Sequence, residues 1–286
     1  MSFQGVIETA ELADLLGNDK LVVLDCRYNL ADTEAGERDY STAHIPGARY
    51  ASLHRDLSGP VQRYGGRHPL PDVTAFTDFA RRAGVQKDTQ VVVYDDQRCA
   101  FAARAWWLLR HFGHQQVAIL NGGFKAWKDA GLPVQEGPGT KDEAQVSDFI
   151  ASAHPSELLH HDDIYPYLNN PPWQLVDARE PRRFSGNEEP IDPIAGHIPT
   201  AVNKPWALLT NENGFIRPLS ELREHWQSIP ADDNILCYCG SGVTACVNLF
   251  SLYLIGREAR LYPGSWSDWC AQILHPRHQQ TSASQP

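Results

Sequence analysis

The sequence predicts an α/β fold made of two tandem domains, each a parallel β-sheet flanked by helices. Short apolar runs alternate with helix-like segments along the chain, which is the pattern of repeated strand and helix units. The runs are apolar at consecutive positions, as expected for strands that helices cover on both faces. Four segments of the first half also recur, in the same order, in the second half. This recurrence indicates a duplicated domain.

The repeat consists of four pairs of segments that share residue types at the same spacing. They contain in turn an Asp-x-Arg motif, a His-Ile-Pro motif, an apolar run that ends in an acid or a thiol, and a glycine turn followed by a tryptophan. The pairs are 24–27 with 176–179, 43–48 with 196–201, 91–95 with 235–239, and 120–127 with 262–269.

We expect strands at the apolar runs and helices where capping residues bracket a helical pattern. Asp72 is a predicted N-cap, while Gly113 and Gly256 are predicted to end helices. The helix before Gly256 is apolar nearly all round and should be buried against its sheet. Strands are predicted at 21–24, 91–94, 117–120, 175–176 and 235–238, and helices at 73–83, 102–112, 219–227 and 244–255.

Composition along the chain predicts the domain boundaries. Residues 1–134 form the predicted first domain and residues 153–275 the second. The stretch 135–152 between them is rich in Gly, Glu and Lys without a sustained apolar period, and it is therefore predicted to be a linker. Residues 276–286 are polar and rich in Ser and Gln, which is typical of a flexible tail.

Overall composition narrows the class of protein. The chain has 286 residues, of which 42% are hydrophobic, and this indicates a globular protein. A net charge of -10 without a basic cluster argues against nucleic-acid and anionic membrane partners. The six cysteines show neither a disulfide framework nor a zinc spacing, so we expect reduced thiols and no metal. Without a secretory-type start or a run long enough to span a bilayer, the sequence predicts a cytoplasmic protein.

The strongest functional signal is Cys239, which ends an apolar run and begins a glycine-containing loop ahead of a helix. Gly240 and Gly242 allow the loop to turn successive N–H groups inward, and the helix adds its own free N–H groups and dipole. Such a site stabilises a thiolate. The carboxyl end of a strand is also where α/β folds place functional sites. Cys239 is therefore the predicted nucleophile, and the other five cysteines are expected to be buried core residues.

The duplicate of this loop in the first half carries Asp95 in place of Cys239. Because an aspartate cannot form a covalent sulfur intermediate, the first domain is predicted to be inactive and to help close the cleft of the second. A cysteine phosphatase would use a similar loop, but it needs an arginine six positions after the cysteine, where this chain has Ala245. A non-catalytic module that binds an anion or the tail of a partner is a further alternative.

Taken together, these segments resemble the tandem rhodanese family of sulfurtransferases over residues 6–272. The resemblance implies two similar domains, of which only the second is catalytic, and transfer of a sulfane sulfur through a persulfide on Cys239. It implies no metal or organic cofactor, and as acceptor it implies cyanide or a thiol such as thioredoxin or glutathione. Besides the repeat motifs, the segments that carry the resemblance are 66–71, 103–108, 239–244 and 264–266.

The loop sequence also favours one sulfur donor. Within the family, Cys-Gly-Ser-Gly-Val-Thr at 239–244 is similar to the 3-mercaptopyruvate sulfurtransferases, whereas thiosulfate-using relatives carry a basic pair after the cysteine. Thiosulfate is a dianion that a cationic loop would stabilise, while mercaptopyruvate carries one carboxylate and suits a neutral loop. The expected reaction moves sulfur from 3-mercaptopyruvate to the acceptor and releases pyruvate. Sulfur transfer from thiosulfate to cyanide is the alternative.

The resemblance places the substrate carboxylate on Arg183, whose planar fork can bind two oxygen atoms. The alternative is a surface arginine paired with an acid such as Glu188 or Glu189. A second substrate arginine, common in animal 3-mercaptopyruvate sulfurtransferases, falls on Asp192 in this chain. Arg182 is a candidate replacement for it, although it is more typical of a solvated side chain.

Two further side chains are predicted to take part in the reaction. The resemblance places His68 near the cleft, where a histidine can assist proton transfer, and no aspartate partner for it is identified. The Ser241 hydroxyl can bond a carbonyl or relay a proton. His44 and His197 are expected to be structural turn residues. The loop residues predicted to bind substrate are Gly240, Gly242, Val243 and Thr244.

Overall fold

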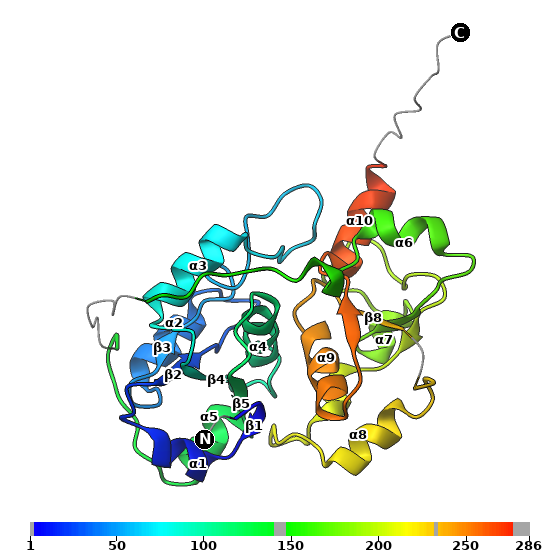
Figure 1. Cartoon of the computed structure of the whole chain (residues 1–286). Coiled ribbons are helices and arrows are strands. Elements are labelled where there is room, and N and C mark those ends of the chain that lie inside the picture. The colour runs from blue at the N-terminus through cyan, green and yellow to red at the C-terminus, as the bar shows by residue number, and fades with distance from the viewer. Residues whose placement is uncertain (1–2, 140–146, 232–233, 277–286) are drawn as a thin grey trace.

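A computed structural model describes residues 3–139, 147–231 and 234–276. Its strands form one parallel sheet in each half of the chain (Figure 1). The first sheet has the order β1-β5-β4-β2-β3 and the second the order β7-β6-β8-β9. The strands are β1 (Gly5–Ile7), β2 (Leu21–Asp25), β3 (Arg49–Tyr50), β4 (Gln90–Tyr94), β5 (Val117–Leu120), β6 (Gln174–Asp177), β7 (Val202–Asn203), β8 (Ile235–Tyr238) and β9 (Ala259–Leu261).

Helices connect the strands, as the alternating sequence pattern predicts. The four predicted helices are present as α3, α4, α8 and α9, each shorter than predicted by one or two residues at its ends. The α-helices are α1 (Thr9–Leu15), α2 (Ala35–Thr42), α3 (Val73–Arg82), α4 (Ala102–His111), α5 (Gly123–Asp129), α6 (His161–Ile164), α7 (Pro181–Phe184), α8 (Leu219–Trp226), α9 (Ala245–Leu254) and α10 (Ser265–Leu274). Short 3-10 turns are η1 (Pro155–Glu157), η2 (Tyr165–Tyr167) and η3 (Trp206–Leu209).

Alternate residues of the central strands enter cores on opposite faces of each sheet. In β4, Val91 and Val93 join the core that contains α3 and α4, whereas Val92 joins the core that contains α1 and α5. In β8, Cys237 and Leu236 face opposite cores in the same way. A strand in this position needs apolar side chains at consecutive positions, which explains the continuous apolar runs of the sequence.

The repeat extends to side-chain contacts. Arg27 donates to Asp25 at 2.6 Å and to the Ala43 carbonyl at 2.7 Å, and Arg179 makes the same two contacts at the same distances in the second half. Each arginine thereby ties its strand to the following His-Ile-Pro segment. His44 in that segment donates from Nδ1 to the Tyr40 carbonyl oxygen at 2.8 Å, in keeping with a structural turn residue.

The two halves meet along α4 and α9, which lie side by side at the centre of the molecule (Figure 1). The rings of Trp106 and Phe250 cross there with centroids 4.8 Å apart. Each half also extends a loop toward the strand ends of the other. A Cβ on Gly66 would lie 2.4 Å from the Gly264 carbonyl oxygen, so the loop at 66–68 can approach the second half this closely only with glycine.

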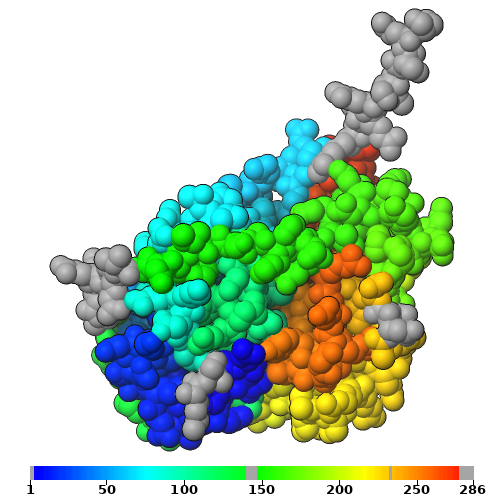
Figure 2. All heavy atoms as spheres, viewed as in Figure 1, coloured from blue at the N-terminus to red at the C-terminus, as the bar shows by residue number. Residues whose placement is uncertain are grey.

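The segment between the halves is held against the first half where the structure describes it. Arg81 donates to the Phe149 carbonyl at 2.9 Å, and the Ala151 N–H donates to Thr77 at 3.1 Å. Figure 2 shows the segment after residue 146 lying across the surface of the first half. The predicted linker is thus partly packed, because it carries buried apolar side chains at its end. The domain limits stay predictions, and residues 140–146 of the linker and 277–286 of the tail lie outside the described residues.

In the part of the chain that the structure describes, no helix has the length and apolar character needed to cross a membrane.

Candidate active site

Cys239 follows β8 directly and is buried, with 2% of its surface exposed. Its N–H donates to the Ser265 hydroxyl at 3.1 Å, and its carbonyl accepts from the Trp266 N–H at 3.0 Å. Both partners belong to the first turn of α10. Cys237, two residues earlier on the same strand, is fully buried in the core, as are the other predicted core cysteines. The fold therefore fixes the backbone of Cys239 on both sides.

The loop after Cys239 has a conformation that requires glycine. Gly242 has a φ of 76°, and a Cβ there would lie 2.3 Å from the Pro263 carbonyl oxygen. Within the described residues, no group accepts a hydrogen bond from the N–H groups of four successive loop residues. These residues are Ser241, Gly242, Val243 and Thr244. The loop is thus a ready donor site for an anion on Cys239.

The copy of the loop in the first half contains a carboxylate in this place. One carboxylate oxygen of Asp95 accepts from the N–H groups of Gln97 and Cys99 at 2.8 and 3.0 Å. The other accepts from Phe101 and Ala102 at 2.8 and 2.9 Å. Burial raises the pKa of Asp95, and these four bonds oppose the rise. The duplicated loop therefore encloses a negative group in the half that has no thiol at this position.

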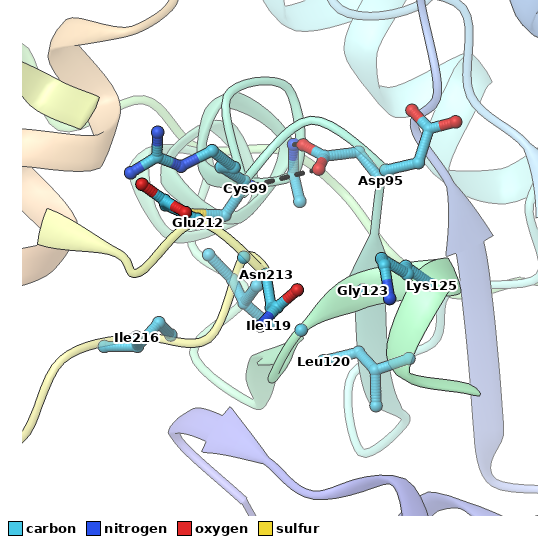
Figure 3. A pocket seen from close by; sticks show the side chains of 14 residues that line it. Asp95, Cys99, Ile119, Leu120, Gly123, Lys125, Glu212, Asn213 and Ile216 are labelled. Atoms are coloured by element: carbon cyan, nitrogen blue, oxygen red, sulfur yellow. Dashed lines mark hydrogen bonds between the residues drawn. The ribbon is translucent and has the colours of Figure 1, made fainter. Parts of the chain in front are cut away.

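A small cavity lies beside this inactive loop rather than beside Cys239. Figure 3 shows that it is lined by Asp95 and Cys99 of the first half and by Glu212, Asn213 and Ile216 of the second half. Its volume is about 60 Å³. A larger cavity of about 720 Å³ lies between the C-terminal parts of α4 and α9. Neither contains a predicted site residue.

Two guanidinium groups lie next to Gly240, the residue after Cys239. A Cβ on Gly240 would lie 3.0 Å from Arg67 Nη2 and 3.5 Å from either terminal nitrogen of Arg183. Asp192 pairs with both arginines, and its carboxylate lies 3.1 Å from Arg183 Nη2. Glu189 binds Arg183 at 2.7 Å from the other side. The absence of a side chain at Gly240 therefore leaves room for two cations next to Cys239.

The predicted arginines have different environments. Arg183 lies at the loop, and it is also paired with Glu189, so the acid partner of the alternative interpretation is present as well. Its side chain is only 13% exposed, which is not typical of a solvated surface arginine. Arg182 is 75% exposed and pairs with Glu188 at 2.9 Å. Arg182 therefore does not occupy the place of the second substrate arginine.

Arg67 is the residue that the sequence interpretation missed. It comes from the first half, within the segment 66–71 that carries the family resemblance, and it stands next to the predicted His68. The Arg67 N–H donates to Ser267 at 3.1 Å, which holds this segment against α10. Its position beside Gly240 depends on contact between the two halves, and no local sequence pattern reports such a contact.

His68 and Ser241 come from different halves and are in direct contact. His68 Nδ1 lies 2.8 Å from the Ser241 hydroxyl oxygen. Burial lowers the pKa of His68 to about 3, and the neighbouring charge of Arg104 adds to this effect. The imidazole is therefore neutral near pH 7, with one nitrogen as donor and the other as acceptor. Asp56, the acid nearest to the place of the aspartate that accompanies this histidine in some relatives, accepts from the Ser52 N–H at 2.9 Å.

The described residues contain no cluster of three or more His, Cys, Asp or Glu side chains that could hold a metal ion. His111, for example, contacts a single acid, Glu157, at 2.9 Å.

Comparison with protein-family models decides the family. The model of the rhodanese-like domain matches residues 8–130 and 161–272. The chain belongs to the rhodanese family. The two matches agree with the two sheets, and the prediction of two tandem rhodanese-like α/β domains is confirmed.

Curated rhodanese relatives are sulfurtransferases with different donors in their names. The chain is 42% identical to a probable 3-mercaptopyruvate sulfurtransferase of Pseudomonas aeruginosa, over 96% of this chain and 98% of the relative. It is 38% identical to a putative thiosulfate sulfurtransferase, SseB, of Mycobacterium tuberculosis, over 96% of both chains. The predicted enzyme class, sulfurtransferase, is confirmed by these relatives.

Solved structures give the same result for this rhodanese. The 3-mercaptopyruvate sulfurtransferase of Leishmania major matches with a TM-score of 0.84 and 30% identity, over 96% of this chain and 76% of the other. SseA of Escherichia coli, from a study of 3-mercaptopyruvate sulfotransferases, matches with a TM-score of 0.81 and 30% identity, over 93% of this chain and all of the other.

Proposed function

We propose that this rhodanese transfers sulfane sulfur from 3-mercaptopyruvate to a thiol or to cyanide, through a persulfide on Cys239, and releases pyruvate. The observation that carries the donor assignment is the contact between His68 and Ser241 next to a loop with no charged side chain of its own. A hydroxyl and a neutral imidazole can move a proton, which cleavage of a carbon–sulfur bond requires and cleavage of thiosulfate does not.

Donor binding is assigned to Arg183 and Arg67. Both guanidinium groups lie within 4 Å of the position that a Cβ on Gly240 would occupy. Each can donate two hydrogen bonds to a carboxylate. Asp192 and Glu189 balance their charge in the free enzyme, so the net field favours a monoanionic donor over a dianionic one.

The sulfur step balances without an outside reagent. The Cys239 thiolate attacks the sulfur of 3-mercaptopyruvate, a sulfur–sulfur bond forms, and the carbon–sulfur bond breaks. Its electron pair stays on the carbon as the enolate of pyruvate. The proton of the donor thiol then passes to that carbon, with Ser241 as the relay and His68 as its partner. The products are pyruvate and a persulfide anion on Cys239.

The free N–H groups of the loop would bind the persulfide anion. Asp95 supports this assignment, since its carboxylate accepts four N–H bonds from the equivalent loop. Preorganised N–H donors of this kind stabilise charge without further rearrangement. The substrate-contact residues assigned to the loop are Gly240, Gly242, Val243 and Thr244.

The second half-reaction removes the outer sulfur. A thiolate or cyanide attacks it, the sulfur–sulfur bond breaks, and the Cys239 thiolate is restored. We assign a reduced protein thiol such as thioredoxin, or glutathione, as the acceptor, and a cytoplasmic location in which such thiols are kept reduced.

Thiosulfate is the second candidate donor, and Arg67 favours it. Two guanidinium groups beside Gly240 can stabilise a dianion even though the loop itself is neutral. One group of curated relatives also carries the name thiosulfate sulfurtransferase. The non-catalytic alternative, an anion-binding module, has less support because Cys239 is held by backbone contacts at the centre of the site.

Donor kinetics test the proposal. With cyanide as acceptor, kcat/KM for 3-mercaptopyruvate should exceed that for thiosulfate. Arg183→Ala should lower kcat/KM for mercaptopyruvate about a hundredfold, because a charged bidentate contact is lost. Arg182→Ala is the matched control, since its side chain is exposed and paired elsewhere, and it should retain wild-type kinetics. A higher kcat/KM for thiosulfate would overturn the donor assignment.

A further inference from the structure

Arg104 of α4 is a fully buried cation without an acidic partner among the described residues. Its guanidinium nitrogens donate to main-chain carbonyl oxygens instead. Nη1 lies 3.0 Å from the Gly242 oxygen and Nη2 lies 3.2 Å from the His68 oxygen. Further bonds of 3.3 to 3.4 Å reach the Leu57 and Pro69 oxygens. A buried charge that is satisfied only by neutral dipoles is costly, so its presence needs a reason.

The carbonyls that Arg104 binds belong to both parts of the candidate site. Gly242 lies in the loop that follows Cys239, in the second half, and His68 lies in the segment from the first half. Ser241 precedes Gly242 in the chain, and its hydroxyl contacts His68 at 2.8 Å. One guanidinium group therefore binds the main chain of His68 and that of Gly242, the neighbour of Ser241.

The charge of Arg104 acts on two cysteines, Cys246 and Cys239. Burial lowers the pKa of Arg104, and the nearby Cys246 and Cys239 partly offset this decrease. Arginine nevertheless remains protonated in proteins, so Arg104 is a cation. Burial raises the pKa of Cys246 to about 12 and raises the pKa of Cys237 as well. The Cys246 thiol donates to the Gly242 oxygen at 3.4 Å. Cys239, the proposed nucleophile, precedes the loop that Arg104 binds at Gly242, so this buried charge can stabilise its anionic form.

The duplicated fold offers an internal comparison. Gly113 and Gly256 end α4 and α9 with positive φ angles of 97° and 78°. Counting back nine residues from each glycine leads to Arg104 in α4 and to Val247 in α9. Helix α4, which reaches the loop after Cys239, thus carries a cation at this turn, whereas α9 carries an apolar side chain at the equivalent place. Interdomain packing alone would not require this difference.

We propose that Arg104 is a positioning residue that joins the catalytic loop to the His68 segment and whose buried charge stabilises the anionic forms of Cys239, thiolate and persulfide. The inference rests on the proposed nucleophile, and it adds a role for the first domain. The first domain supplies this positive charge through Arg104, which binds the loop at the Gly242 carbonyl. Arg67 and Arg183 lie instead at Gly240, where the donor is proposed to bind.

The test is the pH dependence of Cys239 alkylation by iodoacetamide, measured by peptide mass spectrometry in wild type, Arg104→Met and Arg104→Lys. The other groups around Cys239 are Arg67, Arg183, the neutral His68, and the thiols Cys237 and Cys246. All of them are retained in each variant. The matched control is Arg98→Met, because Arg98 also binds main-chain carbonyls of the other half, at Ala207 and Thr210, but beside the inactive loop.

Arg104→Met should shift the midpoint of the alkylation profile upward by about one pH unit, and alkylation at neutral pH should be about tenfold slower. Arg104→Lys should keep the wild-type midpoint, because the charge remains, but should lower kcat at least tenfold at similar KM, because the fork is lost. Arg98→Met should lower thermal stability without moving the midpoint.

A folded Arg104→Met variant with the wild-type midpoint would overturn the charge role. If that variant does not fold, Arg104→Lys decides: wild-type kcat, or a midpoint shifted upward, would overturn the proposal. Failure of iodoacetamide to label Cys239 preferentially in the wild type would instead contradict Cys239 as the nucleophile, so the two failures are distinguishable.

Discussion

Arg67 of the first half and Asp192 of the second half form an ion pair beside Gly240. The family resemblance aligns Asp192 with a second substrate arginine of animal relatives, and Arg67 places a guanidinium group beside the Asp192 carboxylate from the other domain. The pair explains how a chain with an acid at this position can still offer two cations to an anionic donor. Asp192 also competes with the carboxylate of the donor for binding to Arg67 and Arg183.

Asp192→Asn should therefore lower the KM for anionic donors. Removing one negative charge next to two guanidinium groups should lower the KM for 3-mercaptopyruvate about fivefold, and that for dianionic thiosulfate by more. Steady-state kinetics with both donors measure the change, and Glu188→Gln serves as a control at an exposed acid. A raised KM for both donors would mean that Asp192 is needed to orient Arg183.

His68 should make stability depend on pH in the mildly acidic range. Burial lowers its pKa from 6.5 to about 3. At a pH between these two pKa values, the histidine is therefore protonated in the unfolded chain but not in the folded chain. Its stabilising contribution is present above pH 6.5 and declines as the pH falls, by about 2 kcal/mol between pH 6.5 and pH 5.

Urea unfolding of His68→Gln at pH 5, 6 and 7 tests this effect. The variant should lose less stability on acidification than the wild type, whereas His160→Gln, at an exposed histidine, should lose as much as the wild type. Equal slopes for wild type and His68→Gln would contradict a neutral buried imidazole.

Gly242→Ala should abolish activity, because the added Cβ would lie 2.3 Å from the Pro263 oxygen at a φ of 76°. We expect a loss of about 3 kcal/mol or more in stability, or a displaced loop with at least a hundredfold lower kcat/KM. Gly256→Ala is the matched control. It has a φ of 78° but no atom within 4 Å of the new Cβ, so it should cost only about 1 kcal/mol and keep its activity.

Asp95→Ala should destabilise the first domain while leaving the chemistry intact. It removes the acceptor of four buried N–H groups, which should cost about 2–4 kcal/mol in unfolding free energy. Asp14→Ala, at an exposed position of α1, should be neutral. A loss of kcat in folded Asp95→Ala larger than twofold would show that the inactive loop also affects the reaction.

The sequence allowed prediction of those features that local patterns encode. Consecutive apolar residues marked β2, β4, β5, β6 and β8, because strands covered on both faces leave that pattern. Duplication predicted the equivalence of Asp95 and Cys239, and the carbonyl of each accepts a main-chain N–H bond from the start of the next helix but one in its half, α5 or α10. The two-residue strands β3 and β7 are too short to leave a periodic pattern.

Contacts between the halves could not be predicted from local patterns. Arg67 and Arg104 reach the candidate site only because α4 packs against α9 and the loop at 66–68 lies over α10. The apolar pattern of α4 predicts that this helix is buried. It does not predict that Arg104 donates a hydrogen bond to the Gly242 carbonyl of the other domain. The family resemblance placed His68 in the cleft, and the 2.8 Å contact with Ser241 is the geometry that agrees with this placement.

Cys239 is proposed to carry the transferred sulfur. Peptide mass spectrometry after incubation with 3-mercaptopyruvate, without an acceptor, measures this most directly, and the five other cysteines serve as internal controls. We expect the mass of one added sulfur atom on the Cys239 peptide, lost again when cyanide is added, and no addition elsewhere. An unmodified Cys239 peptide in enzyme that releases pyruvate, or sulfur found on another cysteine instead, would contradict it.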